Sequence, residues 1–522
     1  MPKIQVLDCT LRDGGYINQW NFGKEIIAKT VDSLIKTQMD IIEIGFLTSL
    51  TQSNENVTLF DSIEDAINLI PSGKSSSQYV LMINHGEYDL GNLPKSNNLL
   101  GLRYAFHKHD LHAAIEQSKI ILQKGYELFL QPMVINAYTS KEISNLIELA
   151  NSLEPYALYI VDSFGVLSPN DVISYSKRFD SELKESIKIG FHSHNNKQFS
   201  MANAVVFIES VNRDKIIDSS IYGMGRGAGN LNTEIIIDYI NNYQNLTYYK
   251  SLNLLDIIEE YYYPIQRKAP WGYSLPFYLS AKHFLHPNYA KHLIDLDTLS
   301  IEEIEKILET INVKDRVAYN SRLIQQKYVS FQSSKQSNNF ERMVSKIKFS
   351  KDILIVLPGR SHLNVVDRMN ELYESGYTLI SVNFVPVDVN INYVFISNTK
   401  RVDQVGITKI PVIKTSNIDY DFENQEVVRY SEHINQLEYV NDNALLMLLS
   451  ILKQFDPNQI SIAGLDGYDP LYIAQNNLYN ENSTSDDSIT TKNDNIARYL
   501  REYKEAVKVN FKYLTPSKFI KF

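Results

Sequence analysis

The sequence contains a single cysteine, Cys9, among its 522 residues. One thiol cannot form an internal disulfide framework or a metal cluster built on thiolates alone, so a bound metal would need His, Asp, Glu or Asn ligands. The chain also lacks any run of about 18 or more apolar residues. Its first residues lack the charged and apolar regions of a signal peptide. We therefore expect a cytoplasmic protein without a transmembrane segment.

An excess of positive charge is absent too. Lys and Arg number 51 and Asp and Glu 61, which gives a formal net charge of −10. Nucleic acids and anionic membranes attract basic surfaces, so we expect neither as a partner. Hydrophobic residues make up 44% of the chain and charged residues 21%, as in ordinary globular proteins, and this length usually forms two or three domains. A small-molecule substrate is the better expectation.

Up to about residue 245, the sequence contains short apolar runs separated by segments of helical periodicity, such as residues 24–38 and 111–125. This alternation is typical of repeated βα units around a buried parallel sheet. Eight strands are predicted, at Ile4–Cys9, Ile41–Phe46, Tyr79–Ile83, Gly101–Phe106, Leu128–Val134, Ala157–Asp162, Ile187–His192 and Ile216–Ile221. Eight βα units predict a (β/α)₈ TIM barrel, whose chemistry lies at the C-terminal ends of the strands.

Two more regions follow this barrel of residues 1–245. Residues 246–335 are predicted to form a helical extension, in which Ser300 is placed as the N-cap of a helix within 299–311. A polar stretch at 332–339 is typical of a linker. The α/β pattern then resumes, and residues 345–522 are predicted to form a Rossmann-like α/β domain.

His192 and His194 stand at the end of the seventh predicted strand, in Phe191-His192-Ser193-His194-Asn195-Asn196. Residues i and i+2 of a strand face the same side, so both imidazoles can bind one ion. Two neutral histidines that only donate hydrogen bonds are the alternative, and the pair needs a third ligand. Asp13, after the first strand, opens onto the same barrel mouth and would complete a His₂-carboxylate site.

Arg12 precedes this aspartate and carries a permanent charge, which would stabilise negative charge developing on a nearby oxygen. The alternative is an Arg12–Asp13 pair that seals a loop, and the two histidines argue against it. Glu43 stands alone between apolar neighbours on the second strand, so it needs a partner. We expect an ion pair with an arginine such as Arg12 or Arg103, which gives Glu43 an orienting role.

A glycine-rich loop follows the eighth strand, with the sequence Tyr222-Gly223-Met224-Gly225-Arg226-Gly227-Ala228-Gly229-Asn230. The third glycine of a dinucleotide fingerprint would fall on Ala228 or Asn230 in the two possible registers, which excludes that motif. Glycines at this density let the backbone approach a ligand or a metal. Asn230 offers an amide oxygen as a further metal ligand.

Three motifs in this order, Thr10–Gly14, His192–His194 and Gly223–Asn230, resemble the DRE-TIM metallolyase superfamily. This superfamily includes 4-hydroxy-2-oxovalerate aldolase, hydroxymethylglutaryl-CoA lyase, and the isopropylmalate and homocitrate synthases. The resemblance covers about residues 1–285 and is closest to the 4-hydroxy-2-oxovalerate aldolase branch. It implies a divalent ion, Mn²⁺ or Mg²⁺, bound by Asp13, His192 and His194, and a pyruvate enolate stabilised by Arg12.

The resemblance also implies roles for two residues on the substrate side. Ser163, at the end of the sixth strand, matches a position whose hydroxyl contacts the substrate carboxylate. Its alternative role is a helix N-cap or turn hydroxyl. Tyr273, in Trp271-Gly272-Tyr273-Ser274, matches a tyrosine that reaches the site as a proton donor or relay. Its alternative role is packing.

Tyr16 departs from the aldolase pattern, in which a histidine base stands three residues after the metal aspartate. The ordinary pKa of tyrosine is about 10, whereas that of histidine is about 6.5. A tyrosine is therefore a poor base unless the metal or Arg12 lowers its pKa. Either Tyr16 is a tuned acid or base, or the proton goes to His107, His109, a metal-bound water or the substrate itself. The aldehyde partner and the reaction direction are therefore left open.

The C-terminal domain is predicted less specifically. Residues 353–361 indicate a strand, a glycine turn and a helix start, which favours anions. Together with residues 381–383 and 462–468, they weakly resemble the Rossmann-like hydroxymethylpterin pyrophosphokinase-like and motility-accessory families, some linked to nucleotide-activated sugars. A domain that only scaffolds or dimerises is the alternative. Residues 479–495 are poor in apolar side chains and are predicted to form a loop.

These observations predict a metal-dependent aldolase, a carbon–carbon lyase that joins or splits a 2-oxo acid such as pyruvate and an aldehyde. We place it in the synthesis of a surface-polysaccharide sugar and allow for a homodimer. A Claisen-type acyl-CoA synthase ranks lower, because the C-terminal region does not resemble the CoA-handling domains of those enzymes. A non-catalytic scaffold is disfavoured, since an unused site would have no reason to keep Arg12, Asp13, His192 and His194 together.

Overall fold

The chain forms two compact units in the computed structural model. One unit comprises residues 1–288 and 312–319, and the other comprises residues 289–311 and 320–522. The helical region predicted at 246–335 is therefore divided between both units. The structure describes residues 2–71, 76–95, 99–245, 247–335, 347–437, 439–468 and 486–517.

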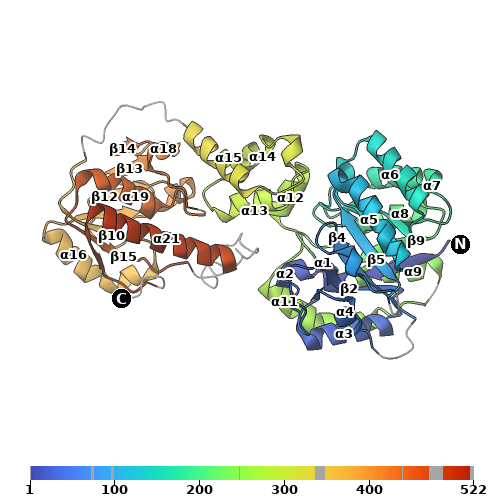
Figure 1. Ribbon diagram of the computed structural model, residues 1–522. Helices are drawn as coiled ribbons and strands as arrows, with labels where there is room; N and C mark the ends of the chain where they lie inside the picture. Colours follow the sequence, from blue (N-terminus) through green and yellow to red (C-terminus); the bar gives the residue numbers. More distant parts are fainter. Residues whose placement is uncertain are drawn as a thin grey trace. The chain divides into compact units, whose positions relative to one another are not determined.

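The first unit is a closed barrel of eight parallel strands surrounded by helices (Figure 1). Strand β1 pairs with β9 on one side and with β2 on the other, where Leu7 lies opposite Ile41, and this second pairing closes the barrel. The predicted TIM barrel is confirmed, and each predicted strand overlaps an observed one. The barrel strands are β1 (Ile4–Asp8), β2 (Ile41–Leu47), β4 (Gln78–Asn84), β5 (Gly101–Phe106), β6 (Glu127–Pro132), β7 (Ala157–Asp162), β8 (Lys188–Ser193) and β9 (Lys215–Ser219), and β3 (Leu59–Phe60) extends β2.

The strands form because their side chains are apolar on both faces, as a sheet covered by helices requires. All seven residues of β2 are buried. One face of the strands packs with the surrounding helices in the main core. The opposite face fills the barrel interior with a second cluster that contains Ile41, Val80, Phe129, Tyr159 and Ile216. This packed interior leaves the chemistry to the strand ends.

Helices follow the strands in the order expected for βα units, and both helical stretches predicted from periodicity are confirmed. Two of the helices begin with capping boxes, Thr139 with Glu142 before α6 and Ser168 with Asp171 before α7. The helices are α1 (Thr10–Asp13), α2 (Gly15–Asn18), α3 (Lys24–Lys36), α4 (Ile63–Ile67), α5 (Leu111–Gln123), α6 (Ser140–Leu153), α7 (Pro169–Glu182), α8 (Ser200–Ser210), α9 (Thr233–Gln244), α10 (Leu252–Ile257), α11 (Tyr263–Lys268) and α12 (Leu275–Lys282).

Three helices complete the region predicted to be helical, namely α13 (Asn288–Asp295), α14 (Ile301–Glu309) and α15 (Ser321–Ser334). The predicted N-cap is confirmed, because the Ser300 hydroxyl accepts the Glu303 backbone N–H at 3.3 Å and the Glu303 carboxylate accepts that of Ser300 at 2.8 Å. The linker predicted at 332–339 is wrong for residues 332–334, which end α15. Residues 336–339 lie outside the described residues.

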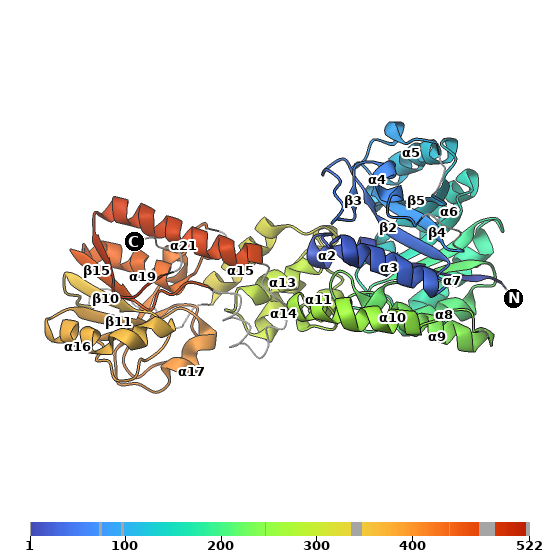
Figure 2. The same ribbon diagram turned by 90° about the horizontal axis from the view of Figure 1, so that it is seen from below.

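The second unit contains a parallel sheet of seven strands in the order β14-β13-β12-β11-β10-β15-β16, as expected for a Rossmann-like α/β domain. Helices α19 (Ala444–Leu452) and α21 (Asp486–Val507) cover one face, and α16 (Val366–Glu374) and α17 (Val402–Val405) the other (Figure 2). The strands are β10 (Asp352–Val356), β11 (Thr378–Val382), β12 (Tyr393–Ile396), β13 (Val412–Thr415), β14 (Gln425–Val428), β15 (Gln459–Ala463) and β16 (Asn510–Tyr513).

The strand order of this sheet reverses between β10 and β15, and the anion-favouring turn predicted at 353–361 lies there. In the structure, the carboxylate of Asp466 occupies this turn. The Ser361 backbone N–H donates to Asp466 at 3.1 Å, and the Ser361 hydroxyl donates to the same carboxylate. A β-carbon at Gly359 would collide with the Gly464 carbonyl, so this close approach requires glycine.

Helix α21 corrects the loop predicted at 479–495. Residues 486–495 form the first part of this 22-residue helix, while residues 479–485 lie outside the described residues. Ile489, Ile496 and Leu500 are spaced seven and four residues apart, so they share one helical face, and all three are buried. A few apolar residues on one face are thus enough to pack this helix against the domain. No helix in the described ranges is long and apolar enough to cross a membrane.

Candidate metal centre

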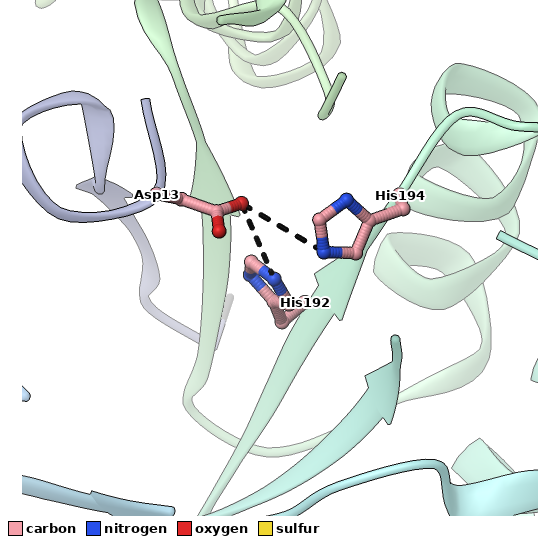
Figure 3. A group of neighbouring side chains, drawn as sticks. All are labelled: Asp13, His192 and His194. Atoms are coloured by element: carbon pink, nitrogen blue, oxygen red, sulfur yellow. Dashed lines mark ion pairs between the residues drawn. The ribbon is translucent and has the colours of Figure 1, made fainter. Parts of the chain in front are cut away.

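The structure brings together the three side chains that the sequence analysis expected to share one ion (Figure 3). His192 lies on β8, His194 follows it, and Asp13 lies on α1 directly after β1. The Asp13 Oδ2 atom is 3.9 Å from His192 Nε2 and 3.8 Å from His194 Nε2. All three side chains are buried, and their nearest ligand atoms lie within 4.8 Å of one another.

The segment that carries Asp13 is fixed by hydrogen bonds to its surroundings. Asp8 accepts the Thr10 backbone N–H at 3.0 Å, and the Thr10 hydroxyl accepts the Ile221 N–H at 2.7 Å. The Trp20 indole N–H donates to the Arg12 carbonyl at 2.7 Å. These bonds tie α1 to the loop after β9 and hold Asp13 at the barrel mouth.

Both histidines are oriented by contacts on the side away from Asp13. His192 Nδ1 lies 3.0 Å from Asp218 Oδ2, and His194 Nδ1 lies 3.2 Å from the Arg226 carbonyl oxygen. When each Nδ1–H donates to its oxygen, each Nε2 presents its lone pair toward Asp13, as a metal ligand requires. Asp218 is a residue of this site that was not predicted from the sequence. Its signal was the same as that of Glu43, a carboxylate within an apolar strand.

The charge states of these groups suit a cation. Burial alone would raise the pKa of Asp13, but Arg12 and then the two histidines lower it below its ordinary value. Burial lowers the pKa of His194 to about 3. At neutral pH the site therefore presents a carboxylate and a neutral His194 imidazole, the forms that bind metals.

Asn230 lies beside these three side chains. Its Nδ2 donates to Asp13 Oδ2, while its Oδ1 is buried and has no hydrogen-bond partner in the part of the chain that the structure describes. Exchanging the two ends of an amide leaves its shape unchanged. If the amide oxygen and nitrogen of Asn230 are exchanged, Oδ1 faces Asp13, and the two oxygens could then bind one cation. A carboxylate oxygen, two imidazole nitrogens and an amide oxygen fit a divalent ion such as Mn²⁺ or Mg²⁺.

A chain of buried ion pairs links Asp13 to His192 through the barrel interior. Glu43 Oε2 accepts Arg12 Nε at 2.9 Å and Arg103 Nη1 at 2.8 Å, so the expected pairing of Glu43 with an arginine is confirmed. Arg12 Nη1 also donates to Asp13 at 2.9 Å, and Arg103 Nη2 donates to Asp218. Buried charges need such partners, because each one loses its hydration.

The barrel also matches known proteins in sequence. Residues 107–260 match the HMGL-like family model. 4-Hydroxy-2-oxovalerate aldolase from Geobacillus genomosp. 3 is 26% identical over 244 residues, which are 45% of this chain and 71% of the relative. The same-named protein from Carboxydothermus hydrogenoformans is 26% identical over 270 residues, 51% of this chain and 79% of the relative.

A solved structure is also similar to part of this chain. It is the N-terminal domain of a provisionally named aldolase from Bacteroides vulgatus, with 25% identity and a TM-score of 0.48, covering 58% of this chain and 99% of that one. The family match includes both metal-site histidines, and the aldolase alignments extend over about half of the chain. These sequence similarities support a relation of the barrel to the DRE-TIM metallolyases and an enzyme of the lyase type.

Tyr16 lies at the mouth of the barrel, with its side chain 41% exposed. Its ring packs edge-on against Trp20 at 4.8 Å and Phe46 at 6.4 Å between centroids, and the Arg226 guanidinium lies 5.3 Å from the ring centre. Desolvation raises the pKa of Tyr16, and Arg226 only partly opposes this. At neutral pH Tyr16 is therefore a phenol that can donate a proton, not a phenolate base.

Ser163 and Tyr273, the other residues predicted for the site, lie in different surroundings. The Ser163 hydroxyl, at the end of β7, accepts the Val134 backbone N–H at 3.0 Å and keeps its own proton for a second bond. Tyr273 is 59% exposed, and its ring packs near Tyr278. No contact of Tyr273 with Asp13 or the two histidines occurs among the described residues. The substrate roles of Ser163 and Tyr273 stay predictions.

The two alternative bases follow β5 and stack on each other, with ring centroids 5.6 Å apart. His109 is an exposed residue that pairs with Asp110 at 3.2 Å. His107 is half-buried, and burial, followed by His109, lowers its pKa. Of the two, His107 is the better candidate for a neutral imidazole that accepts a proton at neutral pH.

Proposed function

We propose that the barrel is a divalent-metal-dependent aldolase that forms or cleaves a carbon–carbon bond between pyruvate, or a related 2-oxo acid, and an aldehyde. The convergence of Asp13, His192 and His194 on one point carries this proposal. Three protein ligands to one ion would leave further coordination positions for a small oxygen ligand. The names of the relatives support the same chemistry. Four points remain predictions from the sequence. They are the identity of the ion as Mn²⁺ or Mg²⁺, a cytoplasmic location, a homodimer and a role in surface-polysaccharide synthesis.

The chain's own residues divide the work in this proposal. Asp13, His192, His194 and Asn230 would hold the divalent ion, which when bound supplies Lewis-acid polarisation of the 2-oxo group. Arg12 stabilises the charge of the enolate. Its Nε donates to Glu43 and its Nη1 donates to Asp13, which leaves Nη2 as the donor proposed for that oxygen.

Tyr16 supplies the proton in the bond-forming direction. The enolate carbon attacks the aldehyde carbon, and the oxygen of the former aldehyde takes the Tyr16 proton as its negative charge develops. The resulting Tyr16 phenolate regains a proton through solvent, and cleavage runs these transfers in reverse. His107 is proposed to accept the methyl proton of pyruvate and to pass it to solvent, because its lowered pKa keeps the imidazole unprotonated at neutral pH.

Arg12→Ala tests the enolate role. Turnover should fall by about 10²–10³-fold, the usual cost of removing one preorganised donor from a developing oxyanion. Arg12→Lys keeps the charge but loses the planar fork and should recover only part of the rate. Steady-state kinetics with a Mn²⁺ titration separate this loss from any loss of metal affinity. An unchanged turnover number in Arg12→Ala would remove Arg12 from the mechanism.

Asp218→Asn tests the orientation of His192. The amide cannot replace the charge that fixes the imidazole, so Mn²⁺ affinity should fall by about 10–100-fold, as is typical for an outer partner of a metal ligand. Asp180→Asn is the matched control, because Asp180 also pairs with an arginine, Arg213, at 3.0 Å but is not in contact with the site. Mn²⁺ titration by electron paramagnetic resonance measures both variants. Equal affinity in Asp218→Asn and the wild type would contradict the account.

The activity itself is tested with the purified full chain loaded with Mn²⁺ or Mg²⁺. A panel of 4-hydroxy-2-oxo acids should release pyruvate, detected with lactate dehydrogenase and NADH, and a chelator should stop the release. In the opposite direction, pyruvate and aldehydes should yield the same acids. Release of free CoA from acetyl-CoA with a 2-oxo acid, in the absence of pyruvate release, would instead support the Claisen-type alternative.

A further inference from the structure

The positively charged Arg226 side chain lies beside the proposed active site and has no role in the mechanism proposed above. It lies in the glycine-rich loop after β9, its backbone carbonyl faces His194 Nδ1 at 3.2 Å, and its guanidinium lies over the Tyr16 ring. The side chain is only partly exposed. Even so, the guanidinium has no hydrogen bond or ion pair with any residue that the structure describes.

The other barrel arginines with restricted exposure do have partners. Arg12 pairs with Glu43 and Asp13, Arg103 with Glu43 and Asp218, and Arg213 with Asp180 at 3.0 Å. An arginine at the edge of an active site that keeps its five donors free is suited to a ligand. The planar fork of a guanidinium binds a carboxylate or a phosphate through two parallel hydrogen bonds.

The loop holds Arg226 close to the metal ligands. A β-carbon at Gly225, its neighbour, would collide with the Asn230 amide and would lie 3.2 Å from Asp13 Oδ2. The backbone of residue 225 therefore lies against the metal carboxylate, and that of residue 226 against a metal histidine. The loop therefore lines the proposed ion site, and the Arg226 side chain lies against Tyr16.

The groups around Arg226 leave its charge available. Tyr16 presents a neutral ring, and Arg226 itself contributes to the lowered pKa values of neighbouring histidines, among them His107 and His286. The pKa of His286 is about 3, mainly because of burial, so its imidazole is neutral. The carboxylate of Asp13 is already shared with Arg12 and Asn230. The ion and Arg12 serve the 2-oxo acid, which leaves Arg226 for the other reactant.

We infer that Arg226 binds an anionic group, a carboxylate or a phosphate monoester, at the far end of the aldehyde partner. This inference rests on the proposed aldolase function and narrows its substrate class. The carbon chain of the aldehyde would lie along the aromatic wall of Tyr16, Trp20 and Phe46, with its carbonyl beside the enolate and its anion at Arg226. Neutral aldehydes of the same length would be poorer substrates.

The test compares matched aldehydes with the Mn²⁺-loaded full chain and pyruvate. Butanal is paired with 4-oxobutanoate, and glyceraldehyde with glyceraldehyde 3-phosphate, so one pair probes a carboxylate and the other a phosphate. The wild type should prefer the anionic member of at least one pair by about 10–100-fold in kcat/KM, which is the usual strength of a hydrogen-bonded charge pair. The pair with the larger preference identifies the anion.

Arg226→Gln should bring that preference close to one, mainly through the KM of the anionic aldehyde, and Arg226→Lys should restore part of it. Arg267→Gln is the matched control, because Arg267 also lies over a tyrosine ring, that of Tyr263 at 5.8 Å, but on the exposed surface. Its preference should equal that of the wild type. An undiminished preference in Arg226→Gln would overturn the inference. The inference would also be overturned if Arg226→Gln raised the KM of pyruvate by the same factor with neutral and with anionic aldehydes.

Deuterium exchange into the pyruvate methyl separates this inference from the function on which it rests. Exchange needs no aldehyde, so it reports the proposed enolate chemistry alone. Exchange in the wild type together with no preference for anionic aldehydes would reject the role of Arg226 and leave the aldolase proposal intact. Absence of both exchange and pyruvate release would reject the aldolase proposal, and the role of Arg226 with it.

Discussion

Asp13→Asn, His192→Ala and His194→Ala should each lower Mn²⁺ affinity by more than about 100-fold and abolish turnover at micromolar Mn²⁺. The expected loss exceeds the 10–100-fold typical of an outer partner, because each variant removes a direct ligand from a buried set of three. Asp13→Asn also removes the only carboxylate of the three proposed side chains. Electron paramagnetic resonance of free Mn²⁺ measures the affinity, and pyruvate release measures the turnover.

A surface histidine provides the control for these variants. His112 is an exposed residue on α5, so His112→Ala should bind Mn²⁺ and turn over substrate like the wild type. Thermal unfolding of each variant without metal checks that the barrel still folds. Full Mn²⁺ occupancy in all three ligand variants would refute the proposed centre.

Tyr16→Phe should reduce turnover of the complete reaction by about 10²–10⁴-fold, the range typical of a general acid or base. The substitution removes only the hydroxyl, so the ring contacts with Trp20 and Phe46 remain. Exchange of the pyruvate methyl should survive, because the Tyr16 proton is needed only when the aldehyde oxygen develops charge. Rates of the two processes, measured on the same preparation, reveal this separation.

The pH profile adds a second readout for Tyr16. Its pKa is raised above the ordinary value, so the donating phenol should persist over the neutral range and be lost only at strongly alkaline pH. Tyr16→Phe should lack that alkaline loss. Tyr248→Phe is the control, because this tyrosine is 42% exposed, like Tyr16, and packs only against Tyr249 among the ring contacts of the described residues. Unaltered turnover and an unaltered profile in Tyr16→Phe would move suspicion to Tyr273, His107 and His109.

The barrel could be predicted from sequence because its strands are short, almost wholly apolar runs, and burial on both faces leaves little choice of structure. The convergence of Asp13, His192 and His194 followed from that topology, since parallel strand ends share one mouth. Glu43 could be given an arginine partner for a similar reason, because an unpaired carboxylate is not stable in an apolar interior.

Other features depend on contacts between residues far apart in the sequence. Asp218 carries the same lone-carboxylate signal as Glu43, but only the fold brings it to His192 and Arg103. The lack of an ion-pair partner for Arg226 among the described residues likewise depends on which residues the fold places around it. In the second unit, the anion-favouring turn at Ser361 could be predicted, whereas the carboxylate of Asp466 that fills it comes from 105 residues away.

Metal-dependent deuterium exchange tests the central claim most directly. The full chain is incubated with pyruvate in D₂O, with Mn²⁺ or with an excess of chelator, and methyl deuteration is followed by mass spectrometry. The account predicts exchange with Mn²⁺, none above background with chelator, and none with Mn²⁺ in His194→Ala. Exchange at the same rate in all three samples, or no exchange in any of them, would contradict a metal centre that forms the enolate of a 2-oxo acid.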